Sequence, residues 1–342
     1  TFPLSASQVT ANMADRKPGD IYDANKPIFA YNTGGAPLAP LSSPGKQFLA
    51  KTERDNPIKM CFFSPFGEAE LHISSGSSVG VFEPYAHMIL SQSQLQVVFG
   101  PSSTPDTTEH FYVSSSLPIV MSTVNTQHTN SDMVFVPPLS REILGSSDLT
   151  MNVLRTNTNY TVNNVNEVHY FSDQPFALYE AGDGDGTDAE MGLPVEMLGD
   201  TYIVPHTIAD YRIAAIESGV VKVSYIHESS ASVFDTHYIS SASKFEPMEV
   251  VVGGKAGSDT DLFTAQAVRF EGTMPFYLRV NDQPGANEYP VLGYRRTQTD
   301  QYQNSTTIDG NKIKTGKLQS NNFGASAGSE FNLDDGTFKM GG

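Results

Sequence analysis

The chain of 342 residues contains a single cysteine, Cys61, and this scarcity excludes several classes of protein. One cysteine can form neither a disulfide within the chain nor a cysteine-rich zinc site. Secreted proteins of this size often carry disulfides, so the lack of them favours assembly in a reducing cytoplasm. Cys61 lies in the run Met60-Cys61-Phe62-Phe63, which predicts a strand with a small buried thiol.

Charge is also scarce, and basic charge most of all. Charged residues make up 17% of the chain, with 21 basic against 38 acidic residues and a net charge of −17. A nucleic-acid surface needs cations that displace phosphate counterions, so this balance excludes DNA or RNA as a partner. Anionic membranes are disfavoured for the same reason. The acidity keeps like particles apart and suits a surface displayed in many copies.

Long apolar runs and helical periodicity are missing as well. No apolar run approaches the length of a membrane span, so we expect no membrane insertion. The stretch from Thr1 to Ser5 has neither the basic region nor the apolar core of a secretory leader, so we expect no export. Short helical turns are expected only near Ser140–Leu144 and Val195–Leu198.

Short strands separated by turns account for most of the sequence. The chain has 28 glycines and 21 prolines, and its apolar runs end in Gly, Pro or polar clusters. Three runs typical of strands are Leu95–Phe99, Val220–Ile226 and Met248–Val252. The fold class predicted from this pattern is all-β.

An internal repeat emerges when strands that begin with proline are aligned. The anchors Pro27, Pro118, Pro175 and Pro275 each open an apolar strand, and a strand and a small polar turn precede the last three. Proline fits there because it can start a strand without donating a ladder hydrogen bond. The anchors are unevenly spaced, which excludes a solenoid and favours duplicated β-sandwich modules with loop insertions. The expected division is an N-terminal arm (1–24), two β-sandwich modules (25–150 and 151–295) and a C-terminal stem segment (296–342).

The module from about Pro27 to Tyr294 resembles the N-terminal repeats of IgGFc-binding-type surface proteins. The likeness rests on the order strand, polar turn, Pro-led strand, polar loop, Leu-Pro turn, Leu-Gly and strand. It implies a β-structured module for display at a surface.

The C-terminal segment is polar, with isolated apolar residues between Asp-Gly, Thr-Gly and Gly-Gly turns. Two phrases, Asp309 to Ser320 and Phe331 to Gly341, occur in the order found in a segment of tailed-bacteriophage fibre and tail-tip proteins, which this tail resembles. The resemblance implies a virion structural protein whose C-terminal segment belongs to a trimeric stem. A segment of this composition cannot bury a core alone and needs neighbours.

An acidic stretch on a glycine-rich loop is the first candidate for a metal site. Asp183, Asp185, Asp188 and Glu190 could present oxygens to Ca²⁺. The spacing fails the EF-hand pattern, and Asp-Gly pairs also form turns, so a solvated hairpin insertion without a tightly held metal is the preferred interpretation.

Candidate catalytic residues do not assemble into a complete set. The run Gly76-Ser77-Ser78-Val79-Gly80 matches the letters of a nucleophile elbow, but no helix is expected after it. The histidines show neither H-E-x-x-H nor H-x-H spacing, and each is best read as packed or surface histidine: His72, His87, His110, His128, His169, His206, His227 and His237. Asp235 with His237, and His206 with Asp210, are the pairs close enough in sequence to note. The sequence therefore predicts no enzyme and no cofactor.

These observations favour a virion structural protein assembled in the host cytoplasm. It would be a tail, neck or fibre-base component that connects virion proteins or displays a surface for attachment, with itself as a homotrimer and other virion proteins as partners, and a host glycan or protein as a further candidate. One alternative is a bacterial cell-surface adhesin, which would need export. Another is a polysaccharide-degrading tail spike, which would need a pair of carboxylates facing a groove.

Overall fold

The structure is a computed structural model that shows an all-β protein, as the sequence predicts. It describes residues 44–51, 59–78, 80–99, 110–124, 133–145, 151–165, 168–181, 189–205, 209–227, 230–239, 248–252, 267–282, 287–293, 317–319, 329–332 and 336–340. Among these residues the one helix is a single 3₁₀ turn, η1 (Val195–Met197), and no helix there is long and apolar enough to cross a membrane. The chain forms two compact units, residues 1–296 and 297–342, each taken here by itself.

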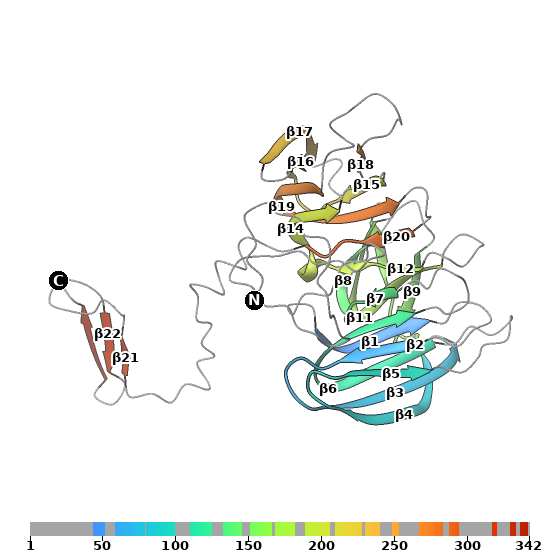
Figure 1. The fold of residues 1–342 in the computed structure, drawn as a ribbon. Coiled ribbons are helices and arrows are strands. Elements are labelled where there is room, and N and C mark those ends of the chain that lie inside the picture. The colour runs from blue at the N-terminus through green and yellow to red at the C-terminus, as the bar shows by residue number, and fades with distance from the viewer. Residues whose placement is uncertain are drawn as a thin grey trace. The chain divides into compact units, whose positions relative to one another are not determined.

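The first unit contains three antiparallel sheets (Figure 1). The first has seven strands: β1 (Gly45–Lys51), β2 (Lys59–Phe63), β3 (Ala69–Ser78), β4 (Val81–Leu90), β5 (Leu95–Phe99), β6 (His110–Val124) and β7 (Met133–Val136). The second has six: β8 (Ser140–Leu144), β9 (Met151–Arg155), β10 (Asn163–Val165), β11 (His169–Ala181), β12 (Ala189–Met191) and β13 (Leu193–Pro194). The third has seven: β14 (Gly199–Pro205), β15 (Ala209–Ala214), β16 (Gly219–His227), β17 (Ser230–Ile239), β18 (Met248–Val252), β19 (Ala267–Asp282) and β20 (Asn287–Pro290).

Three strands predicted from their apolar runs are confirmed as β5, β16 and β18. The helical turn predicted near Val195–Leu198 is η1. The helical turn predicted at Ser140–Leu144 is wrong, because these residues form β8, which pairs with both β11 and β13. Ile143 and Leu144 are both fully buried, so pairing on two sides and burial outweigh the local spacing that favoured a turn.

Each sheet is organised around one long strand, β6, β11 or β19, whose pairing register breaks at the same place. In the first sheet Gly45 pairs with Ile119 and Gln47 with Ser114, so residues 115–118 lie opposite Lys46 alone. The second sheet breaks in the same way between Phe171 and Phe176. The third breaks between Glu271 and Phe276. Each break ends at one of the prolines that anchor the sequence repeat, Pro118, Pro175 or Pro275.

The buried positions on the long strands also coincide when the prolines are aligned. Three positions are buried in every long strand: one residue after the proline, three residues after it and five residues before it. In that order they are Ile119, Met121 and Val113 in β6, Phe176, Leu178 and Tyr170 in β11, and Phe276, Leu278 and Phe270 in β19. Equal burial at equal offsets indicates that the three long strands occupy equivalent environments.

The strands around each long strand pair in the same order. In each repeat the three strands that open the repeat all pair with its long strand. These are β1, β2 and β3 with β6, then β8, β9 and β10 with β11, and finally β14, β15 and β16 with β19. The strand that follows each long strand pairs back with the part of it after the proline. These strands are β7, β12 and β20. β4 and β5 flank the first sheet as β17 and β18 flank the third, and the second sheet has no counterpart to them among its described strands.

The three sheets therefore repeat one pairing pattern. The copy anchored at Pro27 lies outside the described residues, and the two-layer sandwich expected for each module stays a prediction.

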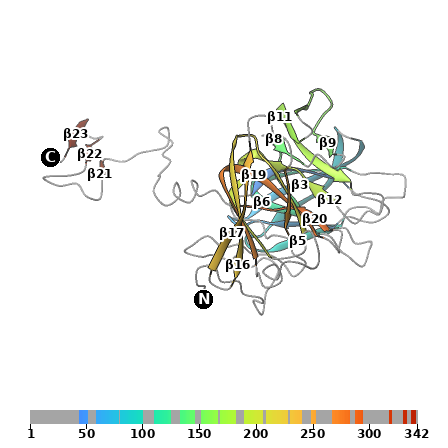
Figure 2. The same cartoon turned by 90° about the horizontal axis from the view of Figure 1, so that it is seen from above.

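The sheets of the first unit share their cores. The strands β1 to β6 curl into a half-barrel, seen at the blue end of the chain in Figures 1 and 2. Its core includes Leu154, Ala177 and Tyr179 from the second sheet. A smaller cluster joins residues of the second and third sheets, among them Leu144 and Tyr277. The expected module boundary at residue 150 falls between β8 and β9, which both pair with β11.

The break in register of β19 leads to a prediction about stability. A Cβ on Gly272 would lie 2.6 Å from the carbonyl oxygen of Met274 and 2.8 Å from the ring of Phe276. Gly272→Ala should therefore lower the free energy of unfolding by about 1–3 kcal/mol, the usual cost of forcing atoms into a packed site. Urea unfolding measures this, with Gln96→Ala at an exposed position of β5 as the control, expected to change stability by no more than about 0.5 kcal/mol. Equal midpoints for the two variants would contradict it.

Candidate functional site

The acidic loop lies almost wholly outside the described residues. Asp183, Asp185 and Asp188 belong to 182–188, and Glu190 lies on β12, where its backbone pairs with Glu180 of β11. Because Ala181 pairs with Ala189, residues 182–188 connect two adjacent antiparallel strands. This topology agrees with a hairpin insertion, and whether calcium binds there stays a prediction.

The run that resembles a nucleophile elbow does not have the required structure. Gly76, Ser77 and Ser78 end β3, and β4 begins at Val81. A nucleophile elbow needs a strand followed by a helix, which exposes a strained serine at the turn between them. Here a hairpin joins two antiparallel strands, so the serines have no such position.

Two histidines and a glutamate converge on the outer surface of the first sheet. Glu70 and His72 lie on β3, and His72 pairs directly with His87 on β4. One carboxylate oxygen of Glu70 lies 2.9 Å from Nε2 of His87 and 3.4 Å from Nε2 of His72. The imidazole rings stack, with centroids 4.5 Å apart and an interplanar angle of 22°. The three potential ligand atoms all lie within 4.8 Å of one another, and all three residues are exposed. This set is called the Glu70–His72–His87 cluster below.

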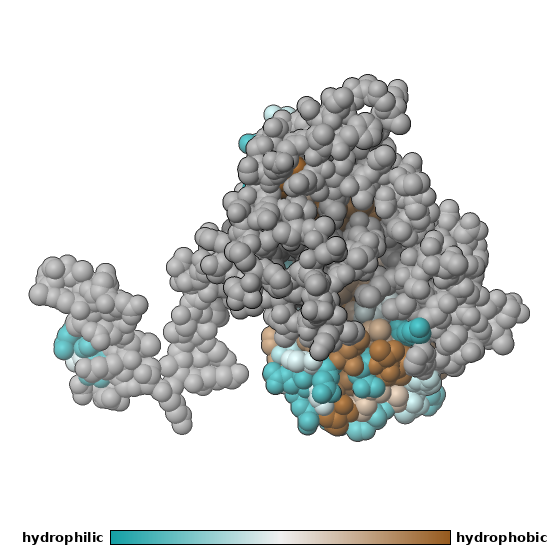
Figure 3. Space-filling model, in the orientation of Figure 1, coloured by the Kyte–Doolittle hydropathy of each residue, from teal (hydrophilic) through white to brown (hydrophobic). Residues whose placement is uncertain are grey.

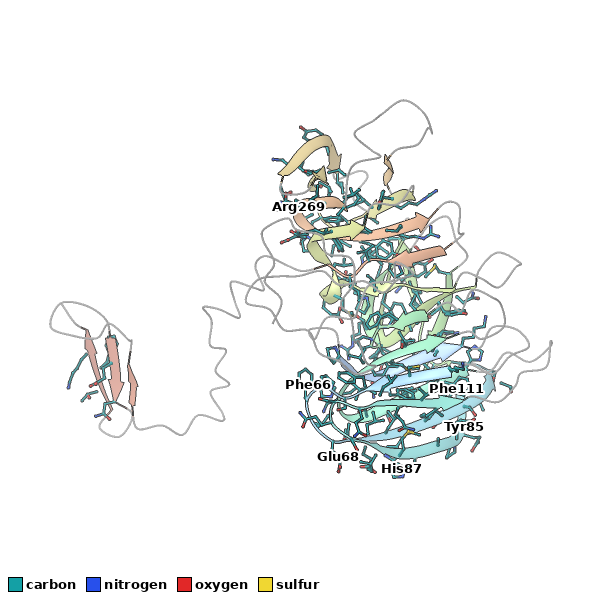
Figure 4. The ribbon with its side chains drawn as sticks, in the orientation of Figure 1. Phe66, Glu68, Tyr85, His87, Phe111 and Arg269 are labelled. Atoms are coloured by element: carbon teal, nitrogen blue, oxygen red, sulfur yellow. The ribbon has the colours of Figure 1, made fainter. Side chains whose placement is uncertain are left out.

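Strand geometry places these side chains together. Residues of β3 alternate between buried Leu71 and Ile73 and exposed Glu70 and His72, as the two-residue period of a half-buried strand requires. The register between β3 and β4 shifts beyond Ile73, which pairs with Ala86, while Ser74 pairs with Pro84. Figure 4 shows Tyr85, the extra residue of this bulge, and His87 on the outer strand of the half-barrel.

Part of this cluster could have been predicted from the sequence. Glu70 and His72 are two residues apart in a strand, which puts them on one face. The contribution of His87 depends on the hairpin register, and a bulge shifts that register within the same hairpin. The sequence alone therefore places Glu70 beside His72 but does not bring His87 to them.

The other histidines form no comparable set among the residues that the structure describes. His169 contacts Glu142, with 2.8 Å between Nε2 and the carboxylate oxygen. His110 is buried at the start of β6. His128 and His206 fall outside the described residues, and the side chains of His227, Asp235 and His237 are not described.

An open groove of about 630 Å³ lies where β1 and β6 meet the links between sheets. Its lining includes Lys46, Gln47, Ser114 and Glu196. The carboxylate of Glu196 accepts a hydrogen bond of 3.1 Å from the hydroxyl of Ser140. Among the described residues that line this groove, Glu196 is the one acidic residue, whereas glycoside hydrolysis needs two facing carboxyl groups.

Exposed hydrophobic side chains occur on the half-barrel that carries the Glu70–His72–His87 cluster. Figure 3 shows hydrophobic residues among hydrophilic ones on the visible face of the half-barrel. Its large exposed apolar residues are Phe66, Val81, Tyr85, Ile89 and Leu95. Ile89, which is 52% exposed, pairs across the strands with Glu70.

Comparison with known proteins adds no assignment. No protein-family model matches the chain, and no match was found among curated proteins. Function is therefore inferred from the residues and their geometry.

The burial of His110 generates a prediction about pH. Desolvation, assisted by the positive charge of Lys51 across the strands, lowers the pKa of His110 below its ordinary value of 6.5. The unfolded chain then binds a proton that the folded chain resists, so His110 makes the free energy of unfolding fall as the pH drops below about 6.5. In His110→Phe, which cannot take up a proton, stability should fall less between pH 7 and pH 5 than in the unmodified chain. Chemical unfolding at each pH measures the two slopes, with Gln96→Ala expected to keep the original slope. Identical slopes for His110→Phe and the unmodified chain would refute this assignment.

Proposed function

We propose that the protein is a structural component of a virion, of the tail, neck or fibre-base type, and that residues 306–342 join copies of it. The observation that carries this proposal is the small β-sheet of the C-terminal unit, on which the described apolar side chain of Phe338 is half exposed. Connection and display, not turnover of a substrate, are the activities that this arrangement serves.

The C-terminal sheet consists of three very short antiparallel strands. They are β21 (Lys317–Gln319), β22 (Ser329–Asn332) and β23 (Thr337–Met340). The register places Leu318, Phe331 and Phe338 in one row across the sheet, and Phe338 is 51% exposed. An isolated sheet needs at least three strands and a hydrophobic face to be stable in water. This sheet has three strands of only three or four residues each, so the apolar area it can bury by itself is small.

Two features stabilise the pairing register of this sheet. Lys339 lies opposite the buried Glu330, with 3.6 Å between Nζ and the carboxylate oxygen. Gly336, immediately before β23, has a φ of +65°, a left-handed conformation that favours glycine. Gly336 is also one of the two glycines of the second phage-like phrase, so that phrase includes a residue that the turn itself requires.

Burial against other copies would stabilise such a segment. Full burial of one large apolar side chain contributes roughly 1.5–3 kcal/mol, and three copies would bring three such rows together. Neighbouring copies would also cover β21 and β23, the two outer strands of this sheet among the described residues. This supports a homotrimer, in agreement with the resemblance to trimeric phage stems. Attachment of the first unit to other virion proteins or to a host surface is the remaining part of the proposal.

The proposal predicts that assembly depends on the C-terminal segment. Deleting Thr306–Gly342 should leave the first unit folded, because residues 1–296 form a compact unit, and should convert an oligomer into a monomer. Phe338→Ser should weaken the oligomer in the same direction, because it removes the exposed apolar residue from the row. Thr337→Ser, at the neighbouring exposed position, is the matched control and should leave assembly intact.

Light scattering coupled to size exclusion measures the mass of each variant. A truncated chain that keeps the mass of the full-length oligomer would refute assembly through the stem. A monomeric full-length chain would refute it as well. Purifying native particles and measuring their size, with the mature N-terminus determined by mass spectrometry, separates a virion protein from an exported adhesin.

A further inference from the structure

We propose that Glu70, His72 and His87 form a binding site for a divalent transition-metal ion, with Zn²⁺ as the probe that defines it. The site lies on the β3–β4 hairpin, does not depend on the proposed virion function, and is separate in sequence from the acidic loop at 183–190. The ion would be held by two imidazole nitrogens and one carboxylate oxygen.

The donor set selects a chemical class of ion. Imidazole nitrogens bind zinc, copper and nickel well, whereas Ca²⁺ and Mg²⁺ prefer sites made wholly of oxygens. Two histidines with one glutamate also form the protein ligands of known zinc sites that keep an open position. This cluster should therefore prefer Zn²⁺ over Ca²⁺.

The distances in the cluster fit one shared ion. Zinc bonds of about 2.0–2.2 Å to nitrogen and oxygen imply that neighbouring ligands of a tetrahedral ion lie roughly 3.3 Å apart. The carboxylate oxygen of Glu70 lies 3.4 Å from Nε2 of His72 and 2.9 Å from Nε2 of His87. All three ligand atoms already lie within 4.8 Å of one another, so small side-chain rotations suffice.

The backbone holds these ligands in place before any ion arrives. The direct pairing of His72 with His87 fixes their Cβ atoms across neighbouring strands, and the stacked rings restrict both side chains further. The backbone N–H of Glu70 donates a hydrogen bond of 2.9 Å to the hydroxyl of Ser116. This bond links the start of β3 to the break in register of β6. Less conformational entropy is therefore lost on binding than three freely moving ligands would lose.

A bound ion would act as a cross-link at the edge of the half-barrel. β4 is the last strand in the order β4-β3-β6-β2-β5, and its described pairings are with β3. One imidazole from each strand on the same ion would resist separation of β4 from β3. Water would complete the coordination, because all three ligands are exposed.

The test is calorimetric titration of the full-length, chelator-treated chain with ZnCl₂. One ion per chain is expected. The variants His72→Gln, His87→Gln and Glu70→Gln should each weaken binding by at least about tenfold, because loss of a residue that only hydrogen-bonds to a metal ligand already costs that much. The matched controls are Glu83→Gln, an exposed acid on the same hairpin, and His169→Gln, from a pair with one histidine and one glutamate. Both controls should bind zinc as the unmodified chain does.

A second measurement guards against variants that fold poorly. Co²⁺ bound by the unmodified chain should give a visible absorption band, which the His72→Gln, His87→Gln double variant should lack while its far-ultraviolet circular dichroism stays unchanged. Zinc binding that survives in the double variant would overturn the proposal. So would half an ion per chain, or displacement of zinc by equimolar Ca²⁺.

Discussion

The break in register on the three long strands is the constraint on which the rest of the first unit depends. Residues inserted at the break fall out of the regular ladder with β1, β8 or β14, so polar groups on that side need other partners. Hydroxyl side chains supply them: the Ser115 hydroxyl donates to the carbonyl of Leu117 at 2.6 Å. The hydroxyls two residues before the proline, Ser116 and Thr273, accept from the backbone N–H of Glu70 and Val220, at 2.9 and 3.0 Å. The proline that ends each break has no N–H to satisfy, and its carbonyl can still accept, as the carbonyl of Pro175 does from the hydroxyl of Tyr160 at 2.7 Å.

Each break also allows one long strand to serve two groups of partners. The half of β6 before Pro118 pairs with β1 and β3, and the half after it pairs with β2 and β7. In the third sheet, the hydroxyl of Tyr202 accepts a hydrogen bond from the N–H of Gly199 at 2.9 Å and donates one to the carbonyl of Phe276. Tyr202 therefore links the start of β14 to β19 beside the break.

Much of this repeat was accessible from the sequence. Proline cannot join a regular ladder, so its recurrence before apolar strands marked Pro118, Pro175 and Pro275 as equivalent positions. The sequence did not reveal that each strand before the proline continues into the strand after it. A short polar stretch such as Ser114–Ser116 has the composition of a turn, and only tertiary pairing shows that the backbone remains extended there. β8 was misassigned for a related reason, since its two partners lie far along the chain. The Glu70–His72–His87 cluster required the hairpin register, which a bulge shifts within the same hairpin.

The late position of each long strand within its repeat has a consequence for how the protein is made. A ribosome releases β1, β2 and β3 before β6, and β14, β15 and β16 before β19, although these strands pair with the later one. Nascent repeats therefore expose unpaired edges until the long strand emerges, a state in which neighbouring chains can associate wrongly. The second repeat offers the shortest such interval, since it lacks described counterparts of β4 and β5. Its strands also complete the core of the half-barrel already synthesised, so each stage of translation closes the apolar surface that the previous stage left open.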